Sequence, residues 1–409
     1  MVPNGWETHH LEDLATKISD GIHSTPKYAD KSPVFFVNGN NLKNGKIVIQ
    51  TTTKHVDEED AKKHRKDLND RTILMSINGT IGNLAYYGGE NVVLGKSASY
   101  INVSPNTDVE FIYYVLSSEK TQAFFTSELT GSTIKNLSLK TIKLTKIDTP
   151  PLPEQRKIAK ILSTWDKAIA TTEKLIETSK QQKKSLMQQL LTGKRRLVNP
   201  DTGKMFEGEW EEIAVGNFGV IYSGGTPSTS NKEYWDGDID WITPTDITKQ
   251  DNVYISSSKR RISVDGLKNS SAKLVPKGSL LVCTRATIGE MAITAHEMCT
   301  NQGFKNIIPN ESTNVEFVFY LLTYEKHQLV SKASGSTFLE LSKSAFESMK
   351  FNVPPIGEQQ KIASVLTAAD KEIEVLEAKL AHFKQEKKAL MQQLLTGKRR
   401  VKVDEMEVA

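Results

Sequence analysis

The fold of this chain is decided by two matching stretches, Pro150-Pro151-Leu152-Pro153-Glu154-Gln155 and Pro354-Pro355-Ile356-Gly357-Glu358-Gln359. They open two segments, residues 150–196 and 354–400, which align without a gap and are identical at 27 of 47 positions. Both segments end in LMQQLLTGKRR, and the copies lie 204 residues apart. An internal repeat of this kind predicts two structural units of one design.

Each copy has the features of one long helix with marked ends. Prolines and a Glu-Gln pair occupy its start, and Gly193 or Gly397 stands at its end. Apolar residues recur every three or four positions, which is the spacing of a coiled-coil seam. In the first copy the seam comprises Ile158, Leu162, Trp165, Ile169, Ile176, Leu186 and Leu190, and in the second Ile362, Leu366, Ile373, Leu376, Leu380, Phe383, Leu390 and Leu394. We predict an antiparallel coiled coil with internal pseudo-two-fold symmetry.

The predicted helices have the length of a spacer. A helix of roughly 38 residues is about 57 Å long, more than the ~34 Å of one turn of B-DNA. Polar residues interrupt the seam at Lys183 and Lys387. Their ammonium groups either fix the helix register or pass the seam on flexible stems.

Two further features of the helices each have two interpretations. A second apolar stripe indicates either a protein partner or packing on a globular block, and it consists of Leu186, Met187, Leu190 and Leu191 with their repeats Leu390, Met391, Leu394 and Leu395. The closing basic clusters either contact phosphate or complement the helix C-termini, and they are Lys194-Arg195-Arg196 and Lys398-Arg399-Arg400.

The blocks outside the helices are diverged copies of each other. Residues 1–149 and 205–353 share mainly apolar, glycine and turn positions, including Gly-Ser-Thr at 131–133 and 335–337. Short β-branched runs predict small strands at Lys46–Gln50, Thr72–Ile77, Val92–Leu94 and Leu280–Thr284. We therefore expect an α+β chain with four parts: two mixed α/β domains (1–149 and 205–353), a first spacer helix (150–204), and a second spacer helix with a tail (354–409).

The charge distribution restricts how nucleic acid can be bound. The net charge is +4, but the helical segments 154–196 and 358–400 carry +7 and +3, so the rest of the chain carries −6. The two blocks therefore lack a diffuse basic field, and any phosphate contacts must be local. A 38% hydrophobic composition without a run of eighteen apolar residues, and with only two cysteines, predicts a cytoplasmic protein without a membrane segment.

Polar runs in the two blocks supply candidates for DNA contacts. Asn and Gln pair with adenine edges, Arg and Lys with guanine, and hydroxyls with bases or phosphate. The candidates in the first block are Ser24, Thr25, Lys27, Asn38, Asn40, Asn41, Lys43, Asn78 and Thr80. Those in the second block are Ser228, Thr229, Thr243, Thr245, Lys249, Arg285, Thr287, Asn301, Gln302 and Lys305. Two like scaffolds with unlike faces predict an asymmetric, bipartite target.

Catalytic motifs are missing from the sequence. The stretch Gly89–Ser97 resembles a phosphate-binding loop, but five residues separate its glycines where four are needed. Histidines, cysteines and acids do not fall at metal-ligand spacings. We expect no catalytic site, no metal and no cofactor in this chain.

Two variable blocks, each followed by a PPxxEQ helix start and a long helix ending in LLTGKRR, resemble the DNA-specificity subunit of type I restriction-modification enzymes. The resemblance implies that residues 1–149 and 205–353 are target recognition domains on double-stranded DNA. It also implies two methyltransferase subunits that use S-adenosylmethionine to methylate adenine, and restriction/translocase subunits that use ATP and Mg²⁺; those cofactors belong to the partners. The alternatives are a stand-alone two-headed DNA-binding or architectural protein, and a coiled-coil adaptor that binds only protein.

Overall fold

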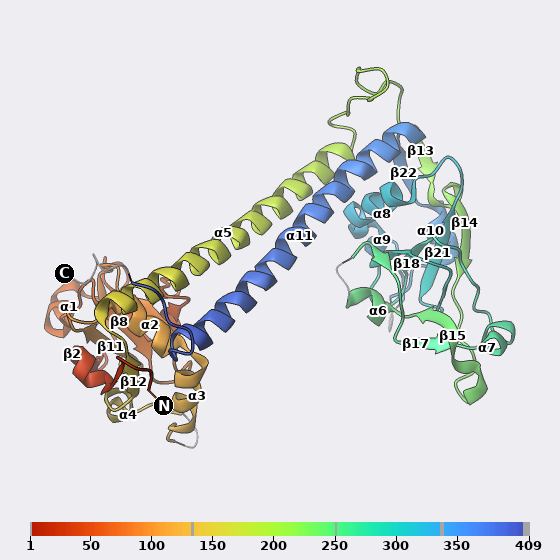
Figure 1. Cartoon of the computed structure of the whole chain (residues 1–409). Helices are drawn as coiled ribbons and strands as arrows, with labels where there is room; N and C mark the ends of the chain where they lie inside the picture. Colours follow the sequence, from red (N-terminus) through yellow and green to blue (C-terminus); the bar gives the residue numbers. More distant parts are fainter. Residues whose placement is uncertain (1, 132–134, 250–251, 336–338, 404–409) are drawn as a thin grey trace. The chain divides into compact units, whose positions relative to one another are not determined.

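The computed structural model describes residues 2–131, 135–249, 252–335 and 339–403 (Figure 1). The chain divides into two compact units: unit 1 comprises residues 1–173 and 378–409, and unit 2 comprises residues 174–377. Each unit therefore contains one globular block and part of both long helices.

The long helices α5 (Leu152–Leu190) and α11 (Ile356–Leu394) have 39 residues each, close to the predicted length. Each begins directly after a proline pair, because proline can occupy the first turn of a helix but not its interior. Beyond each end, Gly193 and Gly397 have φ of 68° and 65°, a left-handed conformation that favours glycine.

The strands of unit 1 form two four-stranded sheets and two small pairs. The central antiparallel sheet has the order β2 (Ala15–Asp20), β11 (Ala98–Val103), β8 (Thr72–Ser76), β9 (Leu84–Tyr86). The second sheet has the order β10 (Val92–Leu94), β4 (Phe35–Val37), β7 (His55–Val56), β3 (Tyr28–Ala29), and only the β10–β4 pair in it is parallel. The pairs are β1 (Glu7–His10) with β12 (Lys146–Thr149), and β5 (Leu42–Lys43) with β6 (Lys46–Ile47).

The helices of the unit 1 block are α1 (Glu58–His64), α2 (Val109–Ser117), α3 (Glu119–Ser127) and α4 (Leu139–Lys143). The main core lies between the central sheet, α2 and the long helices. It includes Phe111, Leu116, Ile158, Leu162 and Leu394, so the ends of α5 and α11 are part of this core.

Unit 2 repeats this plan with small differences. Its central sheet has the order β14 (Gly219–Ser223), β21 (Phe304–Pro309), β18 (Leu280–Cys283), β19 (Met291–Thr294), β16 (Tyr254–Ile255). Its second sheet has the order β17 (Arg260–Ile262), β15 (Trp235–Ile242), β20 (Cys299–Thr300), and β13 (Glu211–Ala214) pairs with β22 (Lys350–Val353). Its helices are α6 (Pro244–Thr248), α7 (Val264–Lys268), α8 (Val315–Tyr324), α9 (Lys326–Ser331) and α10 (Lys343–Ser348).

The predicted strands are found, with one shortened. Val92–Leu94 is β10, and the runs at residues 72–77 and 280–284 contain β8 and β18. The run Lys46–Gln50 is a strand only to Ile47, because its hairpin partner β5 begins only at Leu42, directly after the 3-10 helix Gly39–Asn41. Residues 132–133 and 336–337 of the Gly-Ser-Thr motifs lie outside the described residues. None of the described helices is long and apolar enough to span a bilayer.

Candidate nucleic-acid interface

A buried glutamate ties the start of α5 to the segment that follows α11 in unit 1. Glu154 is 3% exposed and accepts hydrogen bonds from Arg400 Nε and Nη2, both at 2.7 Å. It also accepts one from Trp6 Nε1 at 3.2 Å. Two parallel N–H donors on one carboxylate give a strong and geometrically specific pair.

Unit 2 contains the same arrangement with the repeated residues. Glu358 is fully buried, accepts two bonds of 2.7 Å from Arg196, and accepts one of 3.3 Å from Trp210 Nε1. The last arginine of each basic cluster therefore binds the helix-start glutamate within its own unit. Arg196 and Arg400 were expected either to contact phosphate or to complement the helix C-termini. In the structure their guanidinium groups instead bind buried carboxylates. The sequence contains a signal for this arrangement, because its Trp, Glu and Arg residues all recur at a spacing of 204 positions.

The glutamine after each glutamate links its helix to the globular block. Gln155 accepts a hydrogen bond from the Asp108 amide at 2.9 Å and donates to the Pro150 carbonyl. Gln359 accepts in the same way from the Asn314 amide at 2.9 Å and donates to Pro354. Asp108 and Asn314 are the N-caps of α2 and α8, so each Gln fixes its long helix against an equivalent helix of the block.

The lysines that interrupt the seam form ion pairs at its edge. In unit 1, Lys387 Nζ lies 2.5 Å from Asp166, whose other oxygen accepts from Tyr114 Oη at 2.7 Å. Burial, and then the bond to Asp166, raise the pKa of Tyr114, so it remains a neutral donor.

In unit 2, Lys183 pairs with Asp370, which accepts from Tyr320 at 2.7 Å. The order of partners along the helices is antiparallel in both units. In unit 1, residues 166 and 173 of α5 pair with 387 and 384 of α11; in unit 2, residues 180 and 183 pair with 377 and 370. These pairs favour the interpretation that Lys183 and Lys387 fix the helix register.

The predicted seam residues are all buried or half-buried, whereas the neighbouring Leu175 and Val375 are 48% and 55% exposed. In unit 1, Trp165 packs edge-to-face on Phe383 with ring centroids 5.5 Å apart. The ends of the second apolar stripe lie in the cores of the blocks: Leu190 and Leu191 in unit 2, and Leu394 and Leu395 in unit 1. This stripe therefore packs on the chain's own blocks and is not evidence of a partner.

Three of the predicted DNA contacts in unit 1 line a polar hollow of about 220 Å³. They are Asn38, Asn40 and Asn41, and the other lining residues are Tyr28, Phe36, Gln50, Thr52, Thr53 and Lys54. Amides, hydroxyls and an ammonium group around one hollow are suited to hydrogen bonding with base edges or phosphate.

Asn41 is not available for such a contact. It is 7% exposed. Its side-chain oxygen accepts a hydrogen bond from the backbone N–H of Asn38 at 3.0 Å, and its side-chain nitrogen donates to the Val48 carbonyl at 3.0 Å. Asn38 caps the short 3-10 helix Gly39–Asn41 and accepts from Ser97 Oγ. Asn40 is exposed, and it is the best placed of the three.

The other candidates of unit 1 lie on turns and strand ends. Ser24, Thr25, Lys27 and Lys43 are exposed. Lys27 Nζ lies 3.7 Å from Asp57, which offsets part of its charge. Thr80 is exposed but donates to the Gly39 carbonyl at 3.3 Å, and Asn78 is half-buried.

In unit 2, Thr243 occupies the position of Asn38 and is likewise a helix cap. Its backbone amide and hydroxyl donate to Asp246 at 2.8 and 2.6 Å in a capping box at the start of α6. Thr243 is therefore a structural residue of this turn, and its predicted role as a DNA contact is not supported. Thr245 and Lys249 on the same turn are exposed, as are Ser228 and Thr229.

The remaining candidates of unit 2 are mostly engaged within the fold. Arg285 pairs with Glu340, and the Thr287 hydroxyl is buried. Lys305 is 6% exposed, and burial lowers its pKa. Asn301 accepts from the Gly303 amide at 2.9 Å, whereas Gln302 is exposed and accepts from Thr226. Of this group, only Gln302 faces solvent without an ionic partner among the described residues.

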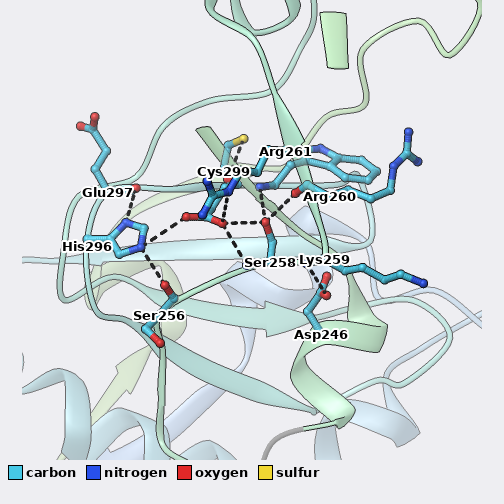
Figure 2. A network of polar contacts seen from close by, with 11 residues as sticks. Asp246, Ser256, Ser258, Lys259, Arg260, Arg261, His296, Glu297 and Cys299 are labelled. Atoms are coloured by element: carbon cyan, nitrogen blue, oxygen red, sulfur yellow. Dashed lines mark hydrogen bonds and ion pairs between the residues drawn. The ribbon is translucent and has the colours of Figure 1, made fainter. Parts of the chain in front are cut away.

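A polar network that the sequence analysis missed surrounds the buried Asp240 (Figure 2). Its carboxylate accepts from Ser258 Oγ at 2.9 Å and from Arg261 Nε at 3.3 Å, and His296 Nε2 lies 3.4 Å away. Hydrogen bonds to the Glu297 and Ser256 carbonyls raise the pKa of His296. These residues lie far apart in the sequence and form no motif, so only the fold brings them together.

The described residues contain no cluster of three or more His, Cys, Asp or Glu side chains that could hold a metal ion. Cys283 and Cys299 are buried, and burial raises the pKa of each thiol to about 12, which makes them poor nucleophiles.

This chain is similar to known specificity subunits of type I restriction enzymes. The family model for the type I restriction modification DNA specificity domain matches it twice, at residues 3–181 and 207–385. The putative MjaX specificity subunit of Methanocaldococcus jannaschii is 30% identical over 421 residues, which cover 98% of this chain and 95% of that protein. The MjaIX specificity subunit of the same organism is 40% identical over 176 residues, 42% of this chain and 40% of that protein.

A solved structure has the same fold. The crystal structure of the S subunit from M. genitalium covers 96% of this chain and 97% of its own, with a TM-score of 0.60 and 16% sequence identity. Because the family model matches both blocks and both helices, the resemblance extends over most of the sequence. The chain belongs to the family of DNA-specificity subunits of type I restriction-modification enzymes.

Proposed function

We propose that this chain reads an asymmetric, bipartite DNA target and directs partner adenine methyltransferase and restriction subunits to it. One observation carries the proposal: both units anchor their helices with the same residues, while the exposed side chains on the two blocks differ. A protein that reads two different half-sites needs two blocks that are held in the same way but present different side chains to the DNA.

Burial, together with the internal bonds of the exposed Thr80 and Arg285, reduces the set of proposed base or phosphate contacts. In unit 1 the set comprises Ser24, Thr25, Asn40, Lys43 and, with part of its charge offset, Lys27; in unit 2 it comprises Ser228, Thr229, Thr245, Lys249 and Gln302. These exposed side chains reach a duplex at the cost of no more than a surface hydrogen bond or ion pair, as at Lys27, Ser228 and Gln302. Asn41, Thr243 and Lys305 are buried or hold a helix cap, so they are excluded from the set.

The proposed complex contains two methyltransferase subunits and restriction/translocase subunits, and it acts in the cytoplasm. We infer that S-adenosylmethionine, ATP and Mg²⁺ are bound by those partners, so that this chain is a non-catalytic subunit. The sequences of the two half-sites follow from the exposed faces and are to be determined by experiment.

The test is methylation mapping of DNA from cells that express this chain with its methyltransferase partner. The expected result is adenine methylation in two short specific elements separated by an unspecified gap. A contiguous motif, or no methylation that depends on this chain, would refute the proposal. Sequence-specific binding by the isolated chain, without a partner, would instead favour a stand-alone DNA-binding protein.

The spacer role of the helices has a separate test. Four residues, about one helical turn or ~6 Å, are inserted into both helices where the units divide, after Glu173 and after Glu377. Such insertions leave the ion pairs of each unit intact, because every pair joins residues on one side of the division. We expect a longer gap between unchanged half-sites. A changed half-site with an unchanged gap would contradict the spacer role.

A further inference from the structure

The second sheet of each unit holds a cation over an aromatic ring beside another aromatic residue. In unit 1, Lys54 Nζ lies 4.4 Å from the centroid of the Tyr28 ring, and the rings of Tyr28 and Phe36 meet edge-to-face at 5.8 Å. We name Tyr28, Phe36 and Lys54 the unit 1 trio.

Unit 2 contains a corresponding trio of different residue types. Arg260 Cζ lies 3.7 Å from the centroid of the Trp235 ring and 5.3 Å from that of Trp241. The two indole rings meet edge-to-face at 5.0 Å. Figure 2 shows Arg260 beside Arg261 and Lys259, at the edge of the Asp240 network. Trp235, Trp241 and Arg260 are the unit 2 trio.

The strand registers place the two trios at the same position of their sheets. In unit 1, the two residues after Lys54 are His55, which pairs with Phe35, and Val56, which pairs with Tyr28. In unit 2, the two residues after Arg260 are Arg261, which pairs with Asp240, and Ile262, which pairs with Trp235. Phe35 and Asp240 each directly precede the second aromatic residue of their trio. All three residue types have changed between the units, from Tyr, Phe and Lys to Trp, Trp and Arg, but the cation over a ring has been kept.

The cations of both trios are exposed and carry uncompensated charge. Among the described residues, neither Lys54 nor Arg260 forms an ion pair, whereas the neighbouring Arg261 pairs with Asp240. An aromatic face attracts a cation and limits the conformations of its side chain, which lowers the entropic cost of binding an anion. On blocks without a net positive charge, 0 for residues 1–149 and −4 for residues 205–353, such a position is a local anion site.

We propose that Lys54 and Arg260 each bind a phosphate of the DNA backbone and that the aromatic residues of the trio position them. The inference rests on the proposed DNA-reading function and identifies which groups hold the backbone. Two half-sites of an asymmetric target differ in their bases but share phosphates. A cation retained at the same position of both units therefore fits the backbone, and the exposed residues that differ around it fit the bases.

The experiment measures DNA binding by the complex of the full chain with its methyltransferase partner as salt rises from about 50 to 200 mM. The variants are Lys54→Gln and Arg260→Gln. Matched controls are Lys17→Gln and Lys273→Gln, which remove lysines that lie 5.9 and 4.9 Å from the rings of Tyr100 and Tyr222, outside the trios. Thermal unfolding of each variant verifies that it folds.

We expect each trio variant to bind target and unrelated DNA about tenfold more weakly, and the slope of log K against log salt to decrease by about 0.9 per variant. The methylated sequence should not change. Arg260→Lys should restore binding, since a phosphate accepts either cation. Tyr28→Leu and Trp235→Leu should weaken binding about threefold while the slope is kept, because the cation remains but is less ordered.

Three results would overturn the assignment. An unchanged slope in both Gln variants excludes a phosphate contact. A methylated sequence relaxed at one base, without rescue by Arg260→Lys, indicates base reading. Equal losses in the Lys17 and Lys273 controls indicate a general effect of charge. Absence of a bipartite target for the unaltered complex would refute the proposed function instead, and the salt slopes on unrelated DNA would still decide the role of the trios.

Discussion

The helix anchors and the second sheets of the two units have diverged to different degrees. At the anchors, Trp6, Glu154 and Arg400 correspond residue for residue to Trp210, Glu358 and Arg196, with bond lengths that agree within 0.1 Å. In the second sheets the geometry is retained but every residue of the trio differs. The contacts that join a block to the helices were thus kept, and the residues that face outward were free to change.

The helix pairs themselves also differ between the units. Unit 1 has Trp165 against Phe383, whereas the equivalent positions in unit 2 are Ala369 and Ser179. Ser179 lies 3.4 Å from Glu372 as a weak hydrogen bond. The two halves of the coiled coil therefore have the same register and different packing.

The strongest test of this comparison replaces residues 205–353 with a copy of residues 1–149. The block should dock, because the helix residues that it contacts are repeated: Ile158, Ala159, Leu162, Leu394 and Leu395 in unit 1 and Ile362, Ala363, Leu366, Leu190 and Leu191 in unit 2. We expect methylation mapping to show a symmetric target made of two inverted copies of the first half-site. Retention of the original second half-site would show that the blocks do not carry the specificity.

The anchor of unit 2 should be more sensitive than that of unit 1. Glu358→Gln leaves the guanidinium of Arg196, 21% exposed, without its carboxylate, and should lower the free energy of unfolding of unit 2 by about 3 kcal/mol. Glu154→Gln should cost about 2 kcal/mol, since Arg400 is 44% exposed and better hydrated.

The measurement is urea unfolding followed by hydrogen exchange, which reports on each unit separately. Glu374→Gln is the control, because it removes one partner of an exposed pair with Lys371 and should change stability by less than about 0.5 kcal/mol. Equal losses for the Glu154, Glu358 and Glu374 variants would contradict the proposed importance of burial.

The aromatic pair between the helices should stabilise unit 1 alone. Trp165→Ala should cost about 2 kcal/mol, less than a fully buried tryptophan, because its side chain is half-buried. A double-mutant cycle with Phe383→Ala should give a coupling of about 1 kcal/mol. An additive double mutant would show that the two rings do not interact in solution.

The repeated parts of the molecule could be predicted from the sequence, and the exposed faces could not. The helix bounds and the apolar seam follow from proline, glycine and a regular spacing, which are local signals. The Glu154–Arg400 and Lys387–Asp166 pairs could also be predicted, since each joins residues that are repeated at a spacing of 204 positions. They were missed because the lysines and arginines were considered without partners.

The recognition faces depend on contacts that have no local signal. Asn38 and Thr243 are polar residues in polar runs, as a base contact would be, and only the fold shows that they cap short helices. Lys54 and Arg260 were not selected because their aromatic partners lie 26 and 25 positions earlier in the chain, on another strand. Charge alone does not distinguish such a cation from a solvated one.

The smallest effect that distinguishes the units is a dependence on pH in unit 2, where His296 lies beside Asp240. The pKa of His296 is raised in the folded state, so protonation stabilises unit 2 below the ordinary value of about 6.5. This stabilisation is lost as pH rises through the folded pKa. It should stay below about 1 kcal/mol, because the side chain is 47% exposed. Thermal unfolding at about pH 5 and about pH 9 should show a larger difference in the unaltered chain than in His296→Gln. If both proteins responded equally to pH, the effect would come from other groups, and unit 2 would not differ from unit 1 in this respect.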